Sequence, residues 1–277
     1  MTHKYLFISA LLLCATLVEA KCELPKGEKV IIGCSTGCSL VYRMRLHLAS
    51  LFTGIPVEIT DMSKTGEGVD ALEKVDAVVV PGGEDIDPRF YLDRVSQELK
   101  TYTEKNLKLV EFTPEGSFRD PYEYTLIKSY SQTPRFEKMP MLGICRGMQM
   151  MAVTEGIPLY LDIKEELGIE NRRNLFDTIE IEKTASLLSS LYEVRQINGF
   201  KYHHQGIRMP YYKMNKEAYP QVNVTATSHE GKFAEAIEYT HRPAIGVQFH
   251  PEKSFPEASS PLFNWLFNKA CEYKNSH

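Results

Sequence analysis

A cysteine stands between two glycines in the segment Gly143-Ile144-Cys145-Arg146-Gly147. The spacing G-x-nucleophile-x-G is typical of a sharp turn from a strand into a helix, where glycines relieve backbone crowding around a reactive side chain. At the start of a helix the macrodipole favours the thiolate form, and the backbone N–H of Arg146 would face a developing oxyanion. The spacing therefore indicates a nucleophile, although a free cysteine is usually a small buried hydrophobe.

A histidine and a glutamate near the C-terminus could complete such a nucleophile, in Gly246-Val247-Gln248-Phe249-His250-Pro251-Glu252. Residues i and i+2 of an extended segment project to the same side, so Glu252 could hold the imidazole of His250 in one tautomer. Cysteine, histidine and glutamate together supply a nucleophile, a base and a group that orients the base. A histidine satisfied at the end of a strand is the alternative.

Paired glycines follow an apolar run in Pro81-Gly82-Gly83-Glu84-Asp85-Ile86-Asp87-Pro88. Glycines at the carboxyl end of a sheet strand let backbone N–H groups approach a ligand closely, and open α/β sheets bind their ligands at that edge. Taken alone, the segment favours an ordinary turn.

Short apolar runs that alternate with helical periodicity predict the scaffold for these segments. Strands are expected at 30–32, 57–59, 77–80, 141–144, 222–227, 233–238 and 244–249. Helices are expected at 40–51, 120–130 and 261–271, and from residue 146 onward. The helix at Asp120 would begin with a carboxylate cap and a proline at its first position. This alternation predicts an α/β domain whose parallel sheet is covered on both faces.

Composition and the N-terminus limit the classes of function. A net charge of −4 and a pI of about 6.1 show no basic excess, so we expect no nucleic-acid partner and a small-molecule or peptide substrate. Residues 1–20 are predicted to be a secretory signal peptide, and 21–277 a single domain. After signal removal no segment is long enough to span a membrane. A retained N-terminal anchor is the alternative.

Removal of residues 1–20 would leave five cysteines, Cys22, Cys34, Cys38, Cys145 and Cys271. In an oxidising compartment four of these could pair and leave one free thiol, but the sequence does not assign the pairs. The segment at 33–38 lacks the Gly-Lys-Ser/Thr ending of a phosphate loop, which favours a turn or a disulfide loop.

Together and in this order, the three segments resemble the class I glutamine amidotransferase superfamily over nearly all of residues 21–277. The stretches PGGEDIDP, RDPYEYTLIK, GICRGMQ, YHHQ, AEAIE and GVQFHPE are most similar to the peptidase C26 branch, which contains γ-glutamyl-γ-aminobutyrate hydrolase. The resemblance implies a three-layer α/β/α sandwich with a central, mostly parallel, flavodoxin-like sheet. It also implies a secreted or periplasmic γ-glutamyl hydrolase that acts through a γ-glutamyl thioester on a small-molecule γ-glutamyl substrate.

The same resemblance implies the residue roles. Cys145 would be the nucleophile, His250 the general base and Glu252 its partner. The N–H groups of Gly83 and Arg146 would form the oxyanion hole. The substrate-binding residues that it implies are Gly82, Gln149, His203, His204 and Gln205. No cofactor and no metal are expected, because adjacent histidines on a strand point to opposite faces and no third ligand accompanies them.

Two segments differ from the pattern of the branch and are expected to border the substrate pocket. The identity of the amine that leaves is therefore not assigned. Asn198-Gly199-Phe200-Lys201-Tyr202 stands where the hydrolases usually have an asparagine-serine pair, and Glu155-Gly156-Ile157-Pro158 replaces a glycine pair. Four further residues match the branch but serve equally well as turn or cap residues, so no chemistry is assigned to them: Asp85, Asp87, Arg119 and Asp120.

Other functions compete with this one. Folate poly-γ-glutamate hydrolysis also fits secretion, and deamidation of a protein glutamine would use the same thioester chemistry. The glutaminase subunit of an ammonia-channelling synthase needs a cytosolic partner, so the predicted signal peptide counts against it. A binding protein that lost the reaction is disfavoured by the intact Cys145, His250 and Glu252. The oligomeric state stays open, a homodimer included.

Overall fold

The computed structural model describes residues 22–169, 176–182 and 185–277. The predicted signal peptide lies outside these residues and stays a prediction. Within them, a nine-stranded sheet has the order β2-β1-β3-β4-β11-β10-β9-β6-β7, and a second sheet pairs β5 with β8. The strands are β1 (Val30–Cys34), β2 (Val57–Asp61), β3 (Ala77–Val80), β4 (Met141–Ile144), β5 (Leu159–Tyr160), β6 (Phe176–Ile181), β7 (Gln196–Phe200), β8 (Gly206–Ile207), β9 (Val222–Ser228), β10 (Phe233–Tyr239) and β11 (Ala244–Val247).

Five neighbouring strands of the large sheet run parallel, from β2 through β1, β3 and β4 to β11. The remaining strands, β10, β9, β6 and β7, extend the sheet through antiparallel pairs. Every residue of β3 and β4 is buried, as expected of parallel strands covered on both faces. The seven predicted strands are confirmed, with ends that differ by about two residues at most.

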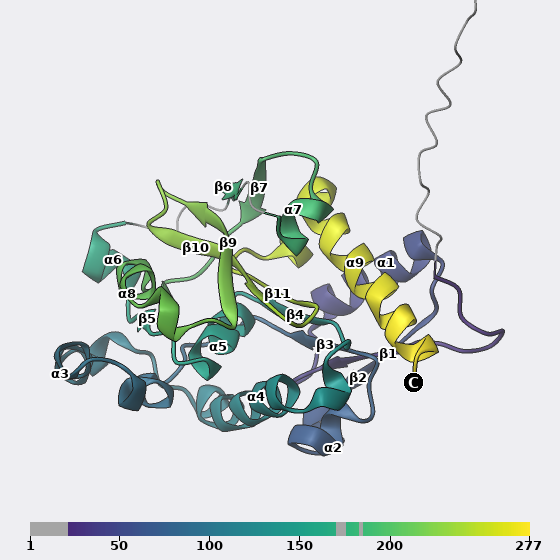
Figure 1. The fold of residues 1–277 in the computed structure, drawn as a ribbon, viewed down its shortest axis with the longest axis horizontal. Helices are drawn as coiled ribbons and strands as arrows, with labels where there is room; N and C mark the ends of the chain where they lie inside the picture. The colour runs from purple at the N-terminus through teal and green to yellow at the C-terminus, as the bar shows by residue number, and fades with distance from the viewer. Residues whose placement is uncertain (1–21, 170–175, 183–184) are drawn as a thin grey trace, which may run out of the picture.

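Helices cover both faces of the sheet, so the domain has three layers (Figure 1). The helices are α1 (Leu40–Thr53), α2 (Gly68–Leu72), α3 (Gln97–Lys105), α4 (Pro114–Gln132), α5 (Arg146–Thr154), α6 (Ile163–Leu167), α7 (Leu187–Leu191), α8 (Met209–Met214) and α9 (Pro256–Asn275). Helix α1 packs beside α9 on one face, whereas α4 packs beside α2 and α5 on the other. Nowhere in the described ranges does a helix have the length and apolar character needed to cross a membrane.

Alternate residues of β3 supply the two hydrophobic cores. Val78 and Val80 join the cluster on the α4–α5 side, and Ala77 and Val79 join the cluster on the α1–α9 side. This alternation follows from the period of two in a strand. The end of β3 is therefore fixed from both faces, which holds the glycine segment that follows it.

Helix α4 begins earlier than the sequence predicted, and the start at Asp120 is wrong. Thr113 is the N-cap, its hydroxyl accepting the N–H of Gly116 at 2.9 Å, and Pro114 is at the first helical position. The same cap-and-proline chemistry at 120–121 therefore lies inside the helix, where Asp120 makes tertiary contacts instead of capping. Helix α9 likewise begins at Pro256 rather than at residue 261, again at an upstream proline.

The described cysteines divide into two disulfides and one thiol. Cys22 pairs with Cys271, which ties the start of the described chain to α9, and Cys34 pairs with Cys38. The second disulfide closes the loop after β1, where the sequence left both a turn and a disulfide loop open. The free cysteine is Cys145, the one that the elbow spacing had singled out.

Candidate active site

The three segments that the sequence singled out for catalysis or ligand binding meet at the carboxyl ends of neighbouring strands. Gly82 follows β3, Cys145 follows β4 and His250 follows β11. A methyl group built on Gly82 would lie 3.0 Å from Cε1 of His250 and 3.5 Å from Cβ of Cys145. Gly82 thus lies against both the imidazole and the thiol-bearing residue. This is the edge at which open α/β sheets bind ligands.

Cys145 has a backbone conformation that L-residues rarely adopt, with φ 53° and ψ −105°. Such strain persists only where the surroundings impose it, and it clusters at functional sites. Here the N–H of Cys145 donates to the carbonyl of Val247 at 2.7 Å, and α5 begins at the next residue. A Cβ at Gly147 would lie 2.0 Å from the carbonyl oxygen of Val80, so only glycine lets α5 approach β3 this closely.

His250 and Glu252 form a buried hydrogen-bonded pair. Nδ1 of His250 lies 2.7 Å from Oε1 of Glu252, although the segment turns into a short 3₁₀ helix instead of staying extended. Burial lowers the pKa of His250, but the neighbouring Cys145 and Glu252 outweigh burial and raise that pKa to about 10. The imidazole is therefore protonated at neutral pH.

Two backbone N–H groups near the sulfur are unoccupied. Within the described residues, neither Gly83 nor Arg146 donates its backbone N–H to an acceptor. The N–H of Arg146 is the first of α5, where helical N–H groups have no partner inside the helix. Both groups are thus able to hold an anion, as the oxyanion prediction requires.

A buried charged cluster links the elbow to the glycine segment. The guanidinium of Arg146 is fully buried and pairs with Asp120 and Glu123 of α4. Burial raises the pKa of Glu123, but Arg146 and Arg119 outweigh burial and lower it. Arg119 also donates to the carbonyl oxygen of Gly82 at 3.1 Å. Arg119 and Asp120 therefore support the site, and Glu123, which the sequence did not single out, joins them.

Tyr42 of α1 is a site residue that sequence reasoning missed. Its hydroxyl accepts the N–H of Gly82 at 2.9 Å. Its pKa is raised well above the ordinary value, first by burial and next by the carboxylate of Glu252. The hydroxyl therefore contacts the glycine segment and lies near Glu252. No motif surrounds Tyr42, so only the packing of α1 against this edge of the sheet shows its place.

Replacing Tyr42 with phenylalanine should lower kcat about 10- to 100-fold, because small displacements of the reacting groups are costly. The loss of a buried hydrogen bond should cost about 1 kcal/mol of stability. Tyr130→Phe is the matched control, since that buried hydroxyl donates to the carbonyl of Met139 at 2.8 Å, within the α4 face. Thermal unfolding should show equal losses of stability in the two variants. Steady-state rates should show a loss of kcat in Tyr42→Phe alone. Equal kcat values would refute the role of Tyr42.

The thiol opens onto a cavity of about 300 Å³. The residues that line it are Gly83, Glu84, Asp85, Glu111, Thr113, Cys145, Gln149, Tyr202, His203, His204 and Gln205. Four of the five predicted substrate-binding residues are among them. Gly82 is the exception, because its N–H is donated to Tyr42 and its carbonyl accepts Arg119.

His203 and Gln205 present an unused acceptor and an unused donor at this cavity. Nδ1 of His203 lies 2.8 Å from the carbonyl oxygen of Gln205, so Nδ1 carries the proton and Nε2 is an acceptor. Burial, and then the charge of Lys201, lower the pKa of His203 to about 3, so the ring is neutral. Among described residues, neither Nε2 of His203 nor Nε2 of Gln205 has a hydrogen-bond partner. Both residues line the cavity, so these two atoms are available to a ligand or to water.

His204 is held differently, between two carboxylates. Its Nδ1 lies 3.1 Å from Asp162 and its Nε2 lies 2.5 Å from Asp85. The expectation that His203 and His204 point to opposite faces of a strand is wrong, because residues 201–205 form a loop and both line the cavity.

Of the two segments that differ from the family pattern, one supports the pocket and the other lies away from it. Lys201 is almost completely buried, and its Nζ lies 3.0 Å from Asp177 and pairs with Glu235, which fixes the start of the histidine loop. Glu155-Gly156-Ile157-Pro158 follows the C-terminal end of α5, the far end of the helix from Cys145, and does not line the cavity. The expectation that this second segment borders the pocket is therefore wrong.

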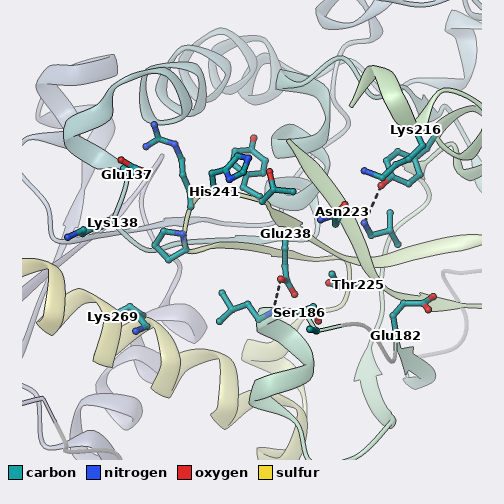
Figure 2. Close-up of a pocket in the computed structure, with 18 of the residues that line it drawn as sticks. Glu137, Lys138, Glu182, Ser186, Lys216, Asn223, Thr225, Glu238, His241 and Lys269 are labelled. Carbon is teal, nitrogen blue, oxygen red and sulfur yellow. Dashed lines mark hydrogen bonds between the residues drawn. The ribbon is translucent and has the colours of Figure 1, made fainter. Parts of the chain in front are cut away.

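A larger cavity, of about 1290 Å³, contains none of the predicted site residues (Figure 2). It lies between α8, β9, β10 and the end of α9. The carboxylate of Glu238 in this cavity accepts the N–H groups of Leu187 and Leu188 at 2.8 and 2.7 Å, so it caps α7. Size alone does not make this cavity the reaction site, because the free thiol and the histidine pair lie elsewhere.

Comparisons with known proteins show the family and the fold of this chain. The family model for peptidase C26 matches residues 36–252. Protein NtpR of Enterococcus hirae is 28% identical over 210 residues, which cover 72% of this chain and 75% of that protein. The γ-glutamyl-γ-aminobutyrate hydrolase of Escherichia coli O157:H7 is 24% identical over 242 residues, which cover 82% and 83%. The glutaminase domain of Trypanosoma brucei CTPS superposes with a TM-score of 0.59 at 15% identity, over 88% of this chain and 94% of that domain. The predicted class I glutamine amidotransferase-like fold is thereby confirmed.

Proposed function

Because the chain belongs to the peptidase C26 family, a family of hydrolase- or amidase-type enzymes, we propose that it is a cysteine-dependent γ-glutamyl hydrolase. The observation that carries this proposal is the convergence of Cys145 with the His250–Glu252 pair beside a cavity of about 300 Å³. That volume is at the lower end for small-molecule sites, which favours a short substrate.

In the first half of the reaction, the thiolate of Cys145 attacks the γ-carbonyl carbon and forms a C–S bond. The negative charge on the carbonyl oxygen is held by the N–H groups of Gly83 and Arg146. The C–N bond then breaks as the imidazolium of His250 gives its proton to the departing nitrogen. This step uses the protonated ring that the thiolate and Glu252 stabilise. A free amine and a γ-glutamyl thioester result.

In the second half, the imidazole acts as a base. The ring has given its proton to the amine, and once the sulfur is acylated the charge of Cys145 no longer raises the pKa of His250, so the neutral ring is the group that accepts a proton from water. The hydroxide oxygen adds to the thioester carbonyl, the C–S bond breaks, and glutamate and the thiolate are released. Glu252 keeps the proton on Nδ1, which leaves Nε2 as the working nitrogen.

The glutamyl end of the substrate would occupy the unused polar atoms. Nε2 of His203 is an acceptor that suits the α-ammonium group, and the side-chain N–H of Gln205 is a donor that suits the α-carboxylate. Gln149 donates to the carbonyl oxygen of Gln205 at 2.9 Å and to Gln248 at 3.1 Å. Gln149 therefore positions the histidine loop.

We also propose that the enzyme acts outside the cytoplasm, in the periplasm or as a secreted protein. The support is the predicted signal peptide together with the pairing of four described cysteines in two disulfides. Disulfides persist in oxidising compartments and are rare in the cytosol.

Intact mass measurement tests the reaction directly. The protein is mixed in turn with γ-glutamyl-γ-aminobutyrate, glutamine, a γ-glutamyl peptide and a folate polyglutamate, and is quenched in acid. A γ-glutamyl adduct on Cys145 with release of the amine is expected from at least one of them, and the rates rank the leaving groups. With the thiol reduced and alkylatable, absence of both adduct and amine from all four would overturn the proposal and favour a protein glutamine or a binding role.

A further inference from the structure

Helix α1 exposes an apolar face to solvent. Six large apolar side chains of this helix are between 40% and 80% exposed: Leu40, Val41, Met44, Leu48, Leu51 and Phe52. At 100° per residue they fall within an arc of roughly 120°. The opposite face packs against the domain through Tyr42, Leu46, Ala49 and Thr53, which are buried. Helix α1 is therefore apolar on both sides.

The exposed face also lacks charged side chains. The two arginines of α1 are half-buried and bonded inward: Nε of Arg43 donates to the carbonyl of Cys38 at 3.1 Å, and Nε of Arg45 donates to that of Glu252 at 2.9 Å. His47 is the single ionisable side chain exposed on this helix. A helix on the surface of a soluble protein normally presents charges outward, and one that is apolar all round is buried. A partner surface is therefore needed to cover α1.

We propose that a second copy of this chain covers the face, with α1 packed against its counterpart around a twofold axis. In such an interface the same patch meets itself, so any charge on it would oppose a like charge. The α1 face meets this condition because its arginines are directed inward. A membrane surface fits less well, because helices that lie on bilayers carry many cationic side chains on their polar side.

The area of the face suits a dimer. Taking about 200 Å² for a fully exposed residue of this size, the six side chains expose about 700 Å² per protomer. A standard interface buries roughly 800 Å² per partner, whereas the largest apolar patch on a typical monomer is about 300–600 Å². Met44 and Leu48 lie at the centre of the arc, so the axis is expected to pass near them.

Dimerisation would also hold in place the edge of the sheet at which the candidate active site lies. The inner face of α1 carries Tyr42, which holds Gly82, and Arg45, which donates to the carbonyl oxygens of Glu252 and Ser254 at 2.9 and 2.8 Å. A partner packed on the outer face would hold this helix from both sides.

Sedimentation equilibrium of the protein without its predicted signal peptide tests the proposal. The wild type is expected to sediment at twice the mass of its monomer at micromolar concentrations. Met44→Asp and Leu51→Asp each place two buried carboxylates across the interface and should weaken dimerisation at least about 100-fold. Met214→Asp is the matched control, because Met214 is 84% exposed and lies on α8; it should remain a dimer. Circular dichroism checks that each variant is folded.

Cysteine cross-linking keeps the proposal testable if an aspartate variant fails to fold. Leu48→Cys should form an intermolecular disulfide on mild oxidation, and Met214→Cys should not. A wild type that stays monomeric at 100 µM, a dimer that survives both aspartate substitutions, or equal cross-linking at the two cysteines would each overturn the proposal. A monomer that binds phosphatidylcholine–phosphatidylglycerol vesicles, and loses that binding in Leu51→Asp, would assign the face to a membrane instead.

Discussion

Replacing Cys145 with alanine is expected to lower kcat for the best γ-glutamyl substrate at least about 10⁴-fold, because no other group in the proposed mechanism can form the thioester. Stability should change little, since the substitution removes one small buried side chain and keeps the backbone conformation. Steady-state rates and the loss of the γ-glutamyl adduct in intact mass spectra measure the effect.

Cys145→Ser is the matched variant, because it keeps the shape of the side chain and replaces sulfur with a weaker nucleophile. It should lose nearly as much activity as the alanine variant and should bind substrate with an unchanged affinity in titration calorimetry. Turnover by Cys145→Ala at more than about 1% of the wild-type rate would show that water is activated without the thiol and would remove Cys145 from the mechanism.

Much of the scaffold could be predicted from the sequence, because local patterns specify it. The β3 and β4 strands are buried on both faces, so their apolar runs were unambiguous, and the glycines at 143 and 147 marked the elbow. The free thiol was also predictable in outline, since the five cysteines beyond the predicted signal peptide cannot all pair. Helix starts were less predictable. Pro121 and Pro261 lie inside helices because an upstream proline begins each one, and local chemistry cannot choose between two equivalent starts.

The residues that hold the active-site segments in position could not be predicted, because their roles depend on contacts between segments that are distant in the sequence. Tyr42 lies 40 residues from the N–H that it accepts, and Arg146 lies 23 residues from Glu123. No spacing rule connects such positions. Lys201 is a similar case: a lysine in a loop normally faces solvent, but contacts of its Nζ with Asp177, Ser228 and Glu235 make its burial favourable.

His250 and Glu252 should be nearly as important as the thiol. Substituting His250 with asparagine is expected to lower kcat about 10³- to 10⁴-fold, because the same ring protonates the amine and later activates water. The rate of acylation in this variant should fall less for substrates with an activated leaving group, such as a γ-glutamyl anilide with a strongly electron-withdrawing ring. Such a leaving group can depart without receiving a proton. A burst of the released anilide followed by slow turnover in stopped-flow absorbance would distinguish the two steps. Equal losses for both classes of leaving group would contradict a role in protonating the amine.

Glu252→Gln tests the electrostatic part of that role. The glutamine keeps the shape but removes the charge, so the pKa of His250 should fall from about 10, which ¹⁵N NMR of the imidazole measures. A histidine whose folded pKa is raised stabilises the fold fully below its unfolded value near 6.5, and this contribution disappears as pH rises through about 10. The variant should therefore be less stable than the wild type at pH 6, and the difference should shrink toward pH 10. A stability difference that does not depend on pH would mean that Glu252 acts by packing alone, and the imidazolium would then be held by the thiolate without it.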